Sequence, residues 1–445
     1  MIEKQRYLNL YYRFQLVGKL FTDPGSVEFS FLYDEKWILD GFPLSPKLPL
    51  SGHFSNTDIT YFFQNLLPEG VNLDEITRLL NISKSEKFEI LRQIGEDVAG
   101  AFILTTEQSI LDDTIFDRPL KHKELSERLA LREQRNFSVW DGKIRVSSAG
   151  FQDKIGIKVI GSEWYLPEGT FNHTSHILKP PPVNSQFESM VVNEFFCMQL
   201  AQNIGLPTAK TTIVEVPEPI LLVERFDRDL QENGFYSKKH IIDGCQLLGL
   251  PTSYKMERPY GSTRDVSHIR DGASIEKLSQ AITQYSSLPV IDLRIFLEWI
   301  AFQLCIGNVD AHAKNLSFFI DRKGKIRLAP FYDQICILDL EQSNENVNLD
   351  SNTLDTDLAL AIGDEFTITE IAPYDIALMA KEAGFPVKAV TTAFNKTAKL
   401  VLQHLDNVAI KDTYQRFESI KNIIRKLSKR LIDITSNVEQ AYKDI

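Results

Sequence analysis

The sequence has no uninterrupted apolar stretch long enough to cross a membrane. A membrane-spanning helix needs about 18 or more consecutive apolar residues, and the best candidate, residues 289–306, is interrupted by three charged side chains. The first twelve residues, MIEKQRYLNLYY, mix charge with aromatic side chains and lack the apolar core of a secretory signal. We therefore expect a cytoplasmic protein with no membrane contact.

Cysteine is scarce, with four in 445 residues. They lie far apart, each in apolar surroundings, at Cys197, Cys245, Cys305 and Cys336. This spacing excludes a disulfide framework and a cysteine metal site, and it predicts reduced, buried thiols.

Positively charged residues are fewer than negatively charged ones. The sequence has 49 lysines and arginines and 60 aspartates and glutamates, which gives a net charge of −11. This balance disfavours non-specific binding to nucleic acid. The basic stretch 421–430, KNIIRKLSKR, is interpreted as the solvated face of a helix.

The sequence also lacks the G-x-x-x-x-G-K-[ST] loop and the G-x-G-x-x-G fingerprint of nucleotide-binding proteins. Residues 146–154, VSSAGFQDK, instead place small residues between two predicted strands. Small residues allow backbone N–H groups to approach an anion. Taken alone, this stretch is more typical of an ordinary hairpin turn than of an anion site.

The length of 445 residues predicts two or three domains. In the first domain, residues 1–110, apolar alternation predicts antiparallel strands over 7–21 and 27–39. Two helices, within residues 57–70 and 73–83, and a strand within 95–104 are expected to follow.

The rest of the chain divides into three parts. Residues 111–136 are predicted to be a connector with one charged helix, and residues 137–228 a small α+β lobe. Residues 229–445 are predicted to be a mainly helical lobe, interrupted by a β-hairpin over 316–329. The fold class is therefore α+β.

The helical lobe contains a closely spaced group of polar residues, GNVDAHAKN, between apolar segments. Asp310 and Asn315 are separated by four residues, which is the spacing of the catalytic base and a magnesium ligand in protein kinases. The predicted hairpin can return the chain to this place and bring Asp333 there as a second metal ligand. The alternative is that Asp310 and Asn315 only cap turns.

Two further residues of this segment carry possible roles. Lys314 could neutralise phosphate charge or orient a substrate hydroxyl, and His312 could fix the loop through a hydrogen bond to its backbone.

The small lobe contains candidates for nucleotide binding. Lys179 ends a predicted strand, from which it could reach phosphate oxygens, and Glu194 on the following helix could hold it. Glu224 and Phe226 lie at the junction of the two lobes, where an adenine ring could bind to main-chain groups. The alternatives are a surface lysine and a buried strand followed by a solvated turn.

Together these motifs resemble the HipA family of serine/threonine kinases, the toxin components of bacterial toxin–antitoxin systems. The resemblance is carried by SSAGFQDK, HILKPP, NEFFCMQLAQNIGLP, LLVERFDR, GNVDAHAKN and LAPFYD, in that order. It extends into the first domain through NLLPEG and GEDVAGAF, and so covers nearly the whole chain.

The resemblance implies a kinase-like two-lobed fold with an added N-terminal domain, and ATP and Mg²⁺ as cofactors. It matches Asp310 to the catalytic aspartate, Asn315 and Asp333 to metal ligands, and Lys179 to the lysine that contacts the ATP phosphates. Glu224 and Phe226 match the hinge near adenine. The phosphate-binding loop is matched by Ser147, Ser148, Ala149, Gly150, Phe151, Gln152, Asp153 and Lys154.

The resemblance also implies partners and regulation. Ser147, or Ser148 beside it, matches a serine that some family members autophosphorylate. A HipB-like helix-turn-helix antitoxin, contacted by the N-terminal domain and binding operator DNA, is expected. So is a protein substrate such as glutamyl-tRNA synthetase or another aminoacyl-tRNA synthetase. Two alternatives are a catalytically idle scaffold for antitoxin and operator, and a lipid or small-molecule kinase.

Overall fold

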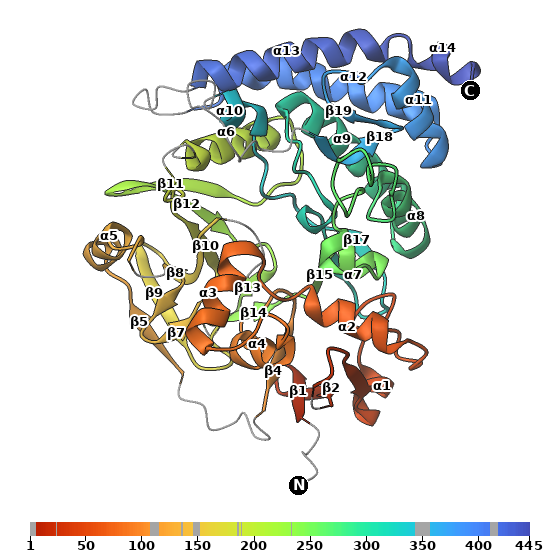
Figure 1. Ribbon diagram of the computed structural model, residues 1–445. Coiled ribbons are helices and arrows are strands. Elements are labelled where there is room, and N and C mark those ends of the chain that lie inside the picture. The colour runs from red at the N-terminus through yellow and green to blue at the C-terminus, as the bar shows by residue number, and fades with distance from the viewer. Residues whose placement is uncertain are drawn as a thin grey trace.

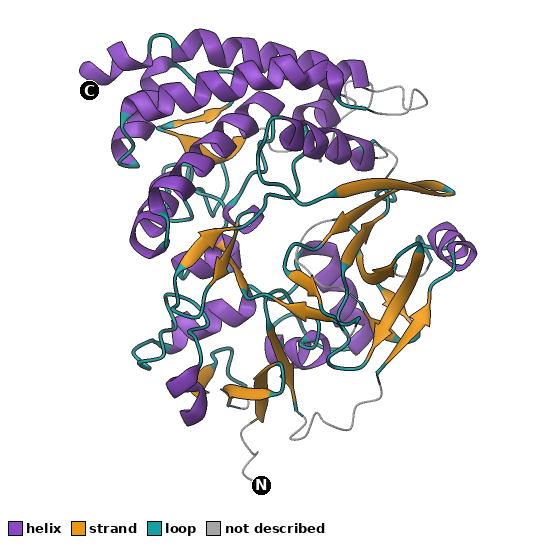
Figure 2. Ribbon diagram, turned by 180° about the vertical axis from the view of Figure 1, so that it is seen from behind, coloured by secondary structure: helices purple, strands orange, loops and turns teal. Residues whose placement is uncertain are grey.

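The structure, a computed structural model, describes residues 6–23, 25–106, 115–134, 137–145, 152–184, 187, 189–232, 234–342, 357–409 and 417–445. The N-terminal domain and a small lobe lie side by side below a larger lobe, and long C-terminal helices cover the far end of that lobe (Figure 1). Strands gather in the N-terminal domain and the small lobe, whereas helices dominate the large lobe (Figure 2).

The N-terminal domain is built on an antiparallel sheet with the strand order β3-β2-β1-β4. Its strands are β1 (Arg6–Tyr12), β2 (Gln15–Thr22), β3 (Ser30–Tyr33) and β4 (Phe102–Thr105). The prediction of one strand over residues 7–21 was wrong, because this segment forms the β1–β2 hairpin. Its turn contains Arg13 in the left-handed region, at φ +53°. Apolar residues continue on both sides of this turn, so the pattern alone did not show the break.

The strand predicted over residues 27–39 is also shorter than expected. It ends at Tyr33, and the chain then forms the helix α1 (Glu35–Asp40). The Asp34 side chain caps this helix by accepting a hydrogen bond of 3.0 Å from the Lys36 N–H. An aspartate at this place stops a strand and starts a helix. The predicted helices are confirmed as α2 (Asn56–Gln64) and α3 (Gly70–Leu80), and α4 (Lys87–Ile94) was not predicted.

The small lobe contains an antiparallel sheet with the order β11-β12-β10-β8-β9-β5. Its strands are β5 (Phe116–Pro119), β8 (Ile155–Ile160), β9 (Glu163–Glu168), β10 (His176–Lys179), β11 (Thr211–Val216) and β12 (Glu218–Glu224). Helix α6 (Met190–Asn203) packs on this sheet. The segment predicted as a connector supplies β5 and the helix α5 (His122–Ala130) to the same lobe.

The large lobe is organised around one buried helix, α9 (Pro289–Ile306), which packs against α8, α12 and α13. The principal helices around it are α8 (Ile275–Tyr285), α11 (Pro373–Glu382), α12 (Val387–His404), α13 (Phe417–Thr435) and α14 (Val438–Lys443). Apolar residues cover most of the α9 surface, which is typical of a helix enclosed on all sides.

The large lobe also contains short strands, so the prediction of a mainly helical segment with one hairpin was incomplete. The predicted hairpin is confirmed as β16 (Ser317–Ile320) and β17 (Ile326–Leu328). The additional strands are β13 (Arg228–Leu230), β14 (Tyr236–Lys238), β15 (Ile241–Asp243), β18 (Asp357–Ile362) and β19 (Glu365–Thr367). Most of them have three residues, too few to give a recognisable alternation.

The prediction for the cysteines is confirmed, because all four are unpaired and buried. Across the described residues, no helix is both long enough and apolar enough to span a bilayer.

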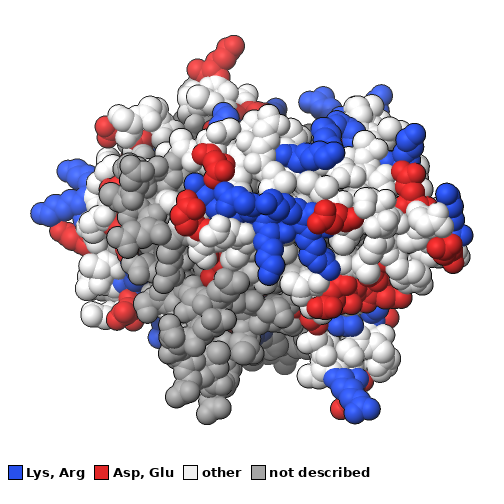
Figure 3. Space-filling model, turned by 90° about the horizontal axis from the view of Figure 1, so that it is seen from above, with Lys and Arg blue, Asp and Glu red and all other residues white. Residues whose placement is uncertain are grey.

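The basic stretch of the C-terminal region lies on α13. Its Lys421 and Arg425 approach the Asp406 carboxylate within 3.7 and 3.1 Å. Seen from the helical end, lysine and arginine side chains gather on the surface with acidic side chains among them (Figure 3). The stretch is therefore a solvated, partly ion-paired helix face, as predicted.

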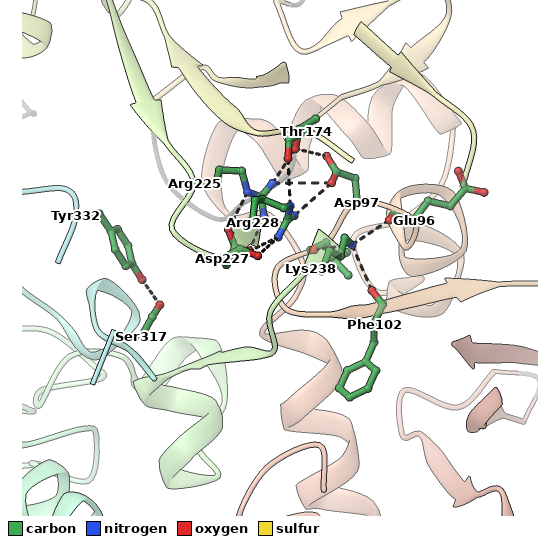
Figure 4. A network of polar contacts seen from close by, with 11 residues as sticks. Glu96, Asp97, Phe102, Thr174, Arg225, Asp227, Arg228, Lys238, Ser317 and Tyr332 are labelled. Carbon is green, nitrogen blue, oxygen red and sulfur yellow. Dashed lines mark hydrogen bonds and ion pairs between the residues drawn. The ribbon is translucent and has the colours of Figure 1, made fainter. Parts of the chain in front are cut away.

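A buried ionic network joins the N-terminal domain to the small lobe (Figure 4). Arg225 donates two hydrogen bonds to the Asp227 carboxylate, at 3.1 and 3.0 Å, and Arg228 donates to the same carboxylate. Asp97 of the N-terminal domain lies 3.6 Å from the Arg228 guanidinium. Burial alone would raise the pKa of Asp227, but the two guanidinium groups outweigh it and hold the pKa well below its usual value.

Lys238 of β14 extends this network into the N-terminal domain. Its ammonium group is buried and donates to the main-chain carbonyls of Glu96, Val98 and Phe102 at 3.2 to 3.4 Å. These bonds tie the loop before β4 to the lobes, so the N-terminal domain is held by polar contacts as well as by apolar packing.

We expect Asp227→Asn to lower the free energy of unfolding by about 3–5 kcal/mol, because it removes the charged acceptor of two buried guanidinium groups and leaves only Asp97, at 3.6 Å or more, as a counter-charge. Since the folded-state pKa of Asp227 is below its unfolded value, this stabilisation should be present above about pH 4 and be lost at lower pH. Urea denaturation at pH 7 measures the effect. The control Asp229→Asn, at a half-exposed carboxylate, should change stability by no more than about 0.5 kcal/mol. Equal losses in both variants would contradict the prediction.

Candidate active site

A cavity of about 500 Å³ lies where the small lobe, the large lobe and the N-terminal domain meet. This volume suits a ligand the size of a nucleotide. The polar lining includes Asn65, Glu69, Gln152, Lys154, Lys179, Glu194, Glu224, Asp243, Lys255, Asp310, His312, Lys314, Asn315 and Asp333.

Most of the predicted site residues therefore share one cavity. Among those in the described part of the chain, Asp153 is the exception: it is half-buried and does not line the cavity. The predicted phosphate-loop residues Ser147, Ser148, Ala149, Gly150 and Phe151 lie outside the described residues.

The loop that carries Asp310 begins where α9 ends. Gly307 terminates that helix at φ +69°, where a β-carbon would lie only 3.0 Å from Leu338, so glycine is favoured. The Asp310 carbonyl accepts hydrogen bonds from the His312 N–H at 2.8 Å and from the Asn315 side-chain amide at 3.0 Å. These bonds fix the loop and place both side chains on the cavity.

The hydrogen bond from Asn315 also determines the orientation of its amide. Because the nitrogen faces a carbonyl, the amide oxygen is left as a free acceptor, which is the atom that a magnesium ion would take. Asp310 is exposed to the cavity. Desolvation by the surrounding protein raises the pKa of the Asp310 carboxyl to about 6, although Lys255 acts in the opposite direction. A carboxylate with a raised pKa is suited to accept a proton.

Lys179 links Asp333 to Glu194. Its ammonium donates to Glu194 at 2.7 Å and to the Asp333 carboxylate. Lys179 and Glu194 are almost fully buried, with exposures of 6% and 1%. Burial would lower the pKa of Lys179, but the two carboxylates outweigh it and raise the pKa above its usual value. The predicted pairing of Lys179 with Glu194 is confirmed.

Asp333 is held in an unusual backbone conformation, at φ +54°. Such a conformation is uncommon outside glycine and is often found at functional sites. Burial would raise the pKa of Asp333, but Lys179 and then Lys154 outweigh it, so the pKa lies below its usual value. The carboxylate is therefore ionised and able to bind a cation.

The donor set fits magnesium. Asp333 and Asn315 offer carboxylate and amide oxygens, which are the hard ligands that Mg²⁺ prefers, and phosphates usually complete its coordination. The described residues contain no group of three or more His, Cys, Asp or Glu side chains that could hold a metal ion.

The cavity also has an apolar lining, here called the apolar slot, which includes residues of the predicted hinge. Phe226 lines it, with its ring 5.9 Å from that of Tyr332, and Glu224 lines it from the end of β12. The apolar lining includes Ile177, Met190, Ala209, Val223, Ile335, Ile337 and Leu340. An apolar slot next to a polar region that contains both lysines and carboxylates matches the two halves of a nucleotide.

Lys314 differs from its predicted role. Its ammonium donates three hydrogen bonds, to Asp243 and to the main-chain and side-chain oxygens of Asn65, at 2.5, 3.0 and 3.1 Å. An ammonium has three donors, so none remains for a phosphate or a substrate. Lys314 therefore holds the Asp310–Asn315 loop against the N-terminal domain.

The loop-fixing role of His312 stays a prediction. The loop is held by its main chain, the ring Nδ1 is buried without a hydrogen-bond partner among the described residues, and a hydrogen bond to the His312 backbone acts on the ring. Burial, followed by the charge of Lys255, lowers the pKa of His312 to about 3, so the ring is neutral.

The sequence did not identify the contribution of the N-terminal domain to the cavity. Asn65 ends α2 and Glu69 precedes α3, and each contacts a lysine of the large lobe. Lys255, the partner of Glu69, was also missed. The two contacting segments are separated by 186 residues or more, so no local pattern could have indicated them.

The fold and the site together define a class. A small sheet-containing lobe, a helical lobe and a cavity with a paired lysine and glutamate, an aspartate and two oxygen ligands are the features of a protein-kinase-like phosphotransferase.

Comparisons with known proteins identify the family. Residues 8–105 match the HipA N-terminal domain, and residues 146–405 match the HipA-like C-terminal domain. The serine/threonine-protein kinase toxin HipA of Shewanella oneidensis is 34% identical over 89% of this chain and 87% of its own. A Sinorhizobium fredii protein whose name classes it as a kinase is 30% identical over 91% of this chain and 93% of its own.

A solved structure agrees with these sequence matches. The Shewanella oneidensis HipA, in a complex with HipB and its operator DNA, superposes with a TM-score of 0.85 at 31% identity, over 97% of this chain and 99% of that one. The chain belongs to the HipA family of serine/threonine-protein kinases.

We expect Lys179→Met to destabilise the fold by about 3–5 kcal/mol, because it leaves the buried Glu194 carboxylate without its partner. The double variant Lys179→Met/Glu194→Met should recover most of this stability but still bind Mg-ATP poorly. Thermal unfolding and titration calorimetry separate the two effects. Lys123→Met, at a lysine whose side chain is 89% exposed, is the control. If the double variant binds Mg-ATP with the affinity of the unchanged protein, Lys179 does not contact the nucleotide.

Proposed function

We propose that this protein transfers the γ-phosphate of ATP to a serine or threonine hydroxyl of a protein, with Asp310 as the catalytic base. The observation that carries the proposal is the convergence of Asp310, Asn315 and Asp333 on one cavity with Lys179. Asp310 would accept the proton of the substrate hydroxyl. Bound magnesium would neutralise phosphate charge, and Asn315 and Asp333 would hold it.

The other nucleotide-binding roles follow from the lining of the cavity. Lys179 and Lys154 would face the phosphates, and the apolar slot beside Glu224 and Phe226 would take the adenine ring. Gln152 lines the cavity and donates to the Pro180 carbonyl at 2.7 Å, which ties the end of the predicted phosphate loop to β10. We propose that this loop, residues 147–154, covers the phosphates and that Ser147 or Ser148 is autophosphorylated.

We further propose that the protein is the toxin of a toxin–antitoxin pair, neutralised by a HipB-like helix-turn-helix protein with which it represses its operon. The likeness to the HipA of the HipA, HipB and operator DNA complex supports this partner. The substrate we propose is an aminoacyl-tRNA synthetase, glutamyl-tRNA synthetase in particular, so that phosphorylation would starve translation and arrest growth.

We expect Asp310→Gln to reduce phosphoryl transfer from radiolabelled ATP by at least about 100-fold, as loss of a general base does, while the thermal transition stays within about 2 °C. Asp265→Gln, at an exposed loop residue of the same lobe, should retain full activity. Mass spectrometry should find phosphate on Ser147 or Ser148 in the control variant alone. In a cell lysate, the Asp265→Gln control should phosphorylate an aminoacyl-tRNA synthetase, whereas the Asp310→Gln variant should not. Undiminished transfer by the Asp310 variant would overturn the proposal.

The partner proposal has its own test. We expect the reading frame next to this gene to encode a short helix-turn-helix protein that elutes with this chain as one complex when the two are produced together. Growth arrest caused by this chain alone should be relieved by that protein. If the neighbouring protein neither binds the chain nor relieves arrest, the toxin–antitoxin assignment fails, whereas the kinase activity does not depend on it.

A further inference from the structure

The polar half of the cavity contains an unusual concentration of negative charge. Asp310 and Asp333 of the large lobe and Glu69 of the N-terminal domain all line it. Glu69 raises the pKa of Asp310, so these two carboxylates repel each other across the cavity. A triphosphate that enters this region needs positive charge near Asp310 as well as near Asp333.

Lys179 and Lys314 do not meet this need. Lys179 is bound between Glu194 and Asp333, on the small-lobe side. The three ammonium hydrogens of Lys314 are committed to Asn65 and Asp243.

Lys255 is a cation on the catalytic-loop side. Its ammonium lies 2.8 Å from the Glu69 carboxylate, and its side chain is 26% exposed and lines the cavity. Its carbonyl accepts a hydrogen bond of 3.0 Å from the Ala313 N–H, which joins its backbone to the segment between Asp310 and Asn315. The residue is thus fixed at both ends, by the catalytic loop and by the N-terminal domain.

The charge of Lys255 acts directly on the proposed base. Of the charged groups around Asp310, Lys255 has the largest effect, and it lowers the pKa of that carboxyl against the effect of desolvation. It is also the charged group with the largest effect on His312. The hydrogen bond to Glu69 uses one of its three ammonium hydrogens, so others can face a ligand.

We propose that Lys255 contacts the terminal phosphate of the nucleotide beside Asp310, and that Glu69 of the N-terminal domain positions its ammonium group. This inference rests on the proposed kinase function and adds a residue to it. It makes the N-terminal domain a part of the phosphoryl-transfer site, because a residue of that domain holds a group that meets the substrate. A cation at this place would lower the charge repulsion between the phosphate and the incoming hydroxyl oxygen.

The test compares nucleotides with and without the terminal phosphate. Titration calorimetry with magnesium and either AMP-PNP or ADP should show that Lys255→Met weakens AMP-PNP binding by about 10-fold or more, whereas ADP binding changes by less than about 2-fold. Lys255→Arg keeps the charge and should retain most of the preference for AMP-PNP. Lys429→Met, at an exposed lysine of α13, should match the unchanged protein.

Glu69→Gln separates positioning from contact. It keeps Lys255 but replaces the ion pair that anchors it by a weaker neutral hydrogen bond, so kcat should fall by about 3- to 10-fold with a KM for ATP within about 2-fold. A merely structural role of Glu69 would instead lower the thermal transition and reduce ADP binding.

The outcomes distinguish this inference from the function on which it rests. If the unchanged protein phosphorylates its substrate and Lys255→Met keeps the AMP-PNP preference, Lys255 is not a phosphate contact and the kinase function remains. If Lys255→Met weakens the binding of AMP-PNP and of ADP by the same factor while the thermal transition is unchanged, the assignment of Lys255 to the terminal phosphate is wrong. If Lys255→Met does not fold, Lys255→Arg decides: loss of the AMP-PNP preference there overturns the inference. If the unchanged protein binds no nucleotide, both proposals fail.

Discussion

One buried ammonium group, that of Lys179, connects the parts of this molecule that must meet for chemistry. It comes from β10 in the small lobe, bonds to Glu194 on α6, and reaches Asp333 in the loop after β17 of the large lobe. A charge buried to this degree is tolerated only when its partners are present. The geometry of the cavity therefore depends on this lysine and on the two carboxylates that share it, because among the described residues no other ion pair joins β10 to the loop around Asp333.

The N-terminal domain contributes a second set of constraints. Asn65 accepts two hydrogen bonds from Lys314 of the Asp310–Asn315 loop, and Glu69 pairs with Lys255, whose carbonyl bonds to the same loop. Lys238 also donates to three of the domain's main-chain carbonyls. The domain is thus attached by buried polar contacts near the site as well as by apolar packing. Buried hydrogen bonds fix the position of the N-terminal domain relative to the lobes more strictly than apolar packing does. A shift of the domain would leave buried hydrogen-bond donors without acceptors.

The sequence predicted the site better than it predicted the smaller elements. The spacing of Asp310 and Asn315 is a local feature, and the hairpin β16–β17 could be recognised from its turn, so the return of the chain to Asp333 followed from sequence. The boundary at Asp34 was missed because apolar alternation carried more weight than one capping residue. The role of Lys314 was wrong because its partners, Asn65 and Asp243, are remote in the chain. A lysine beside a catalytic motif carries no local sign of where its ammonium points.

The backbone at Asp333 shows how these constraints act together. A left-handed conformation at a residue other than glycine costs of the order of 1–3 kcal/mol, and it persists only where the surroundings fix it. Here the Phe331 main chain bonds to Pro207 and Ala209 at 2.8 and 2.9 Å, and the Tyr332 hydroxyl donates to the Lys314 carbonyl at 2.8 Å. Each residue before Asp333 is thus tied to a different lobe, and Lys179 fixes the carboxylate that follows. The positive charge of Lys179 keeps the Asp333 carboxylate ionised, and the carboxylate lines the cavity before any nucleotide binds. The structural reorganisation needed when a nucleotide binds is therefore small.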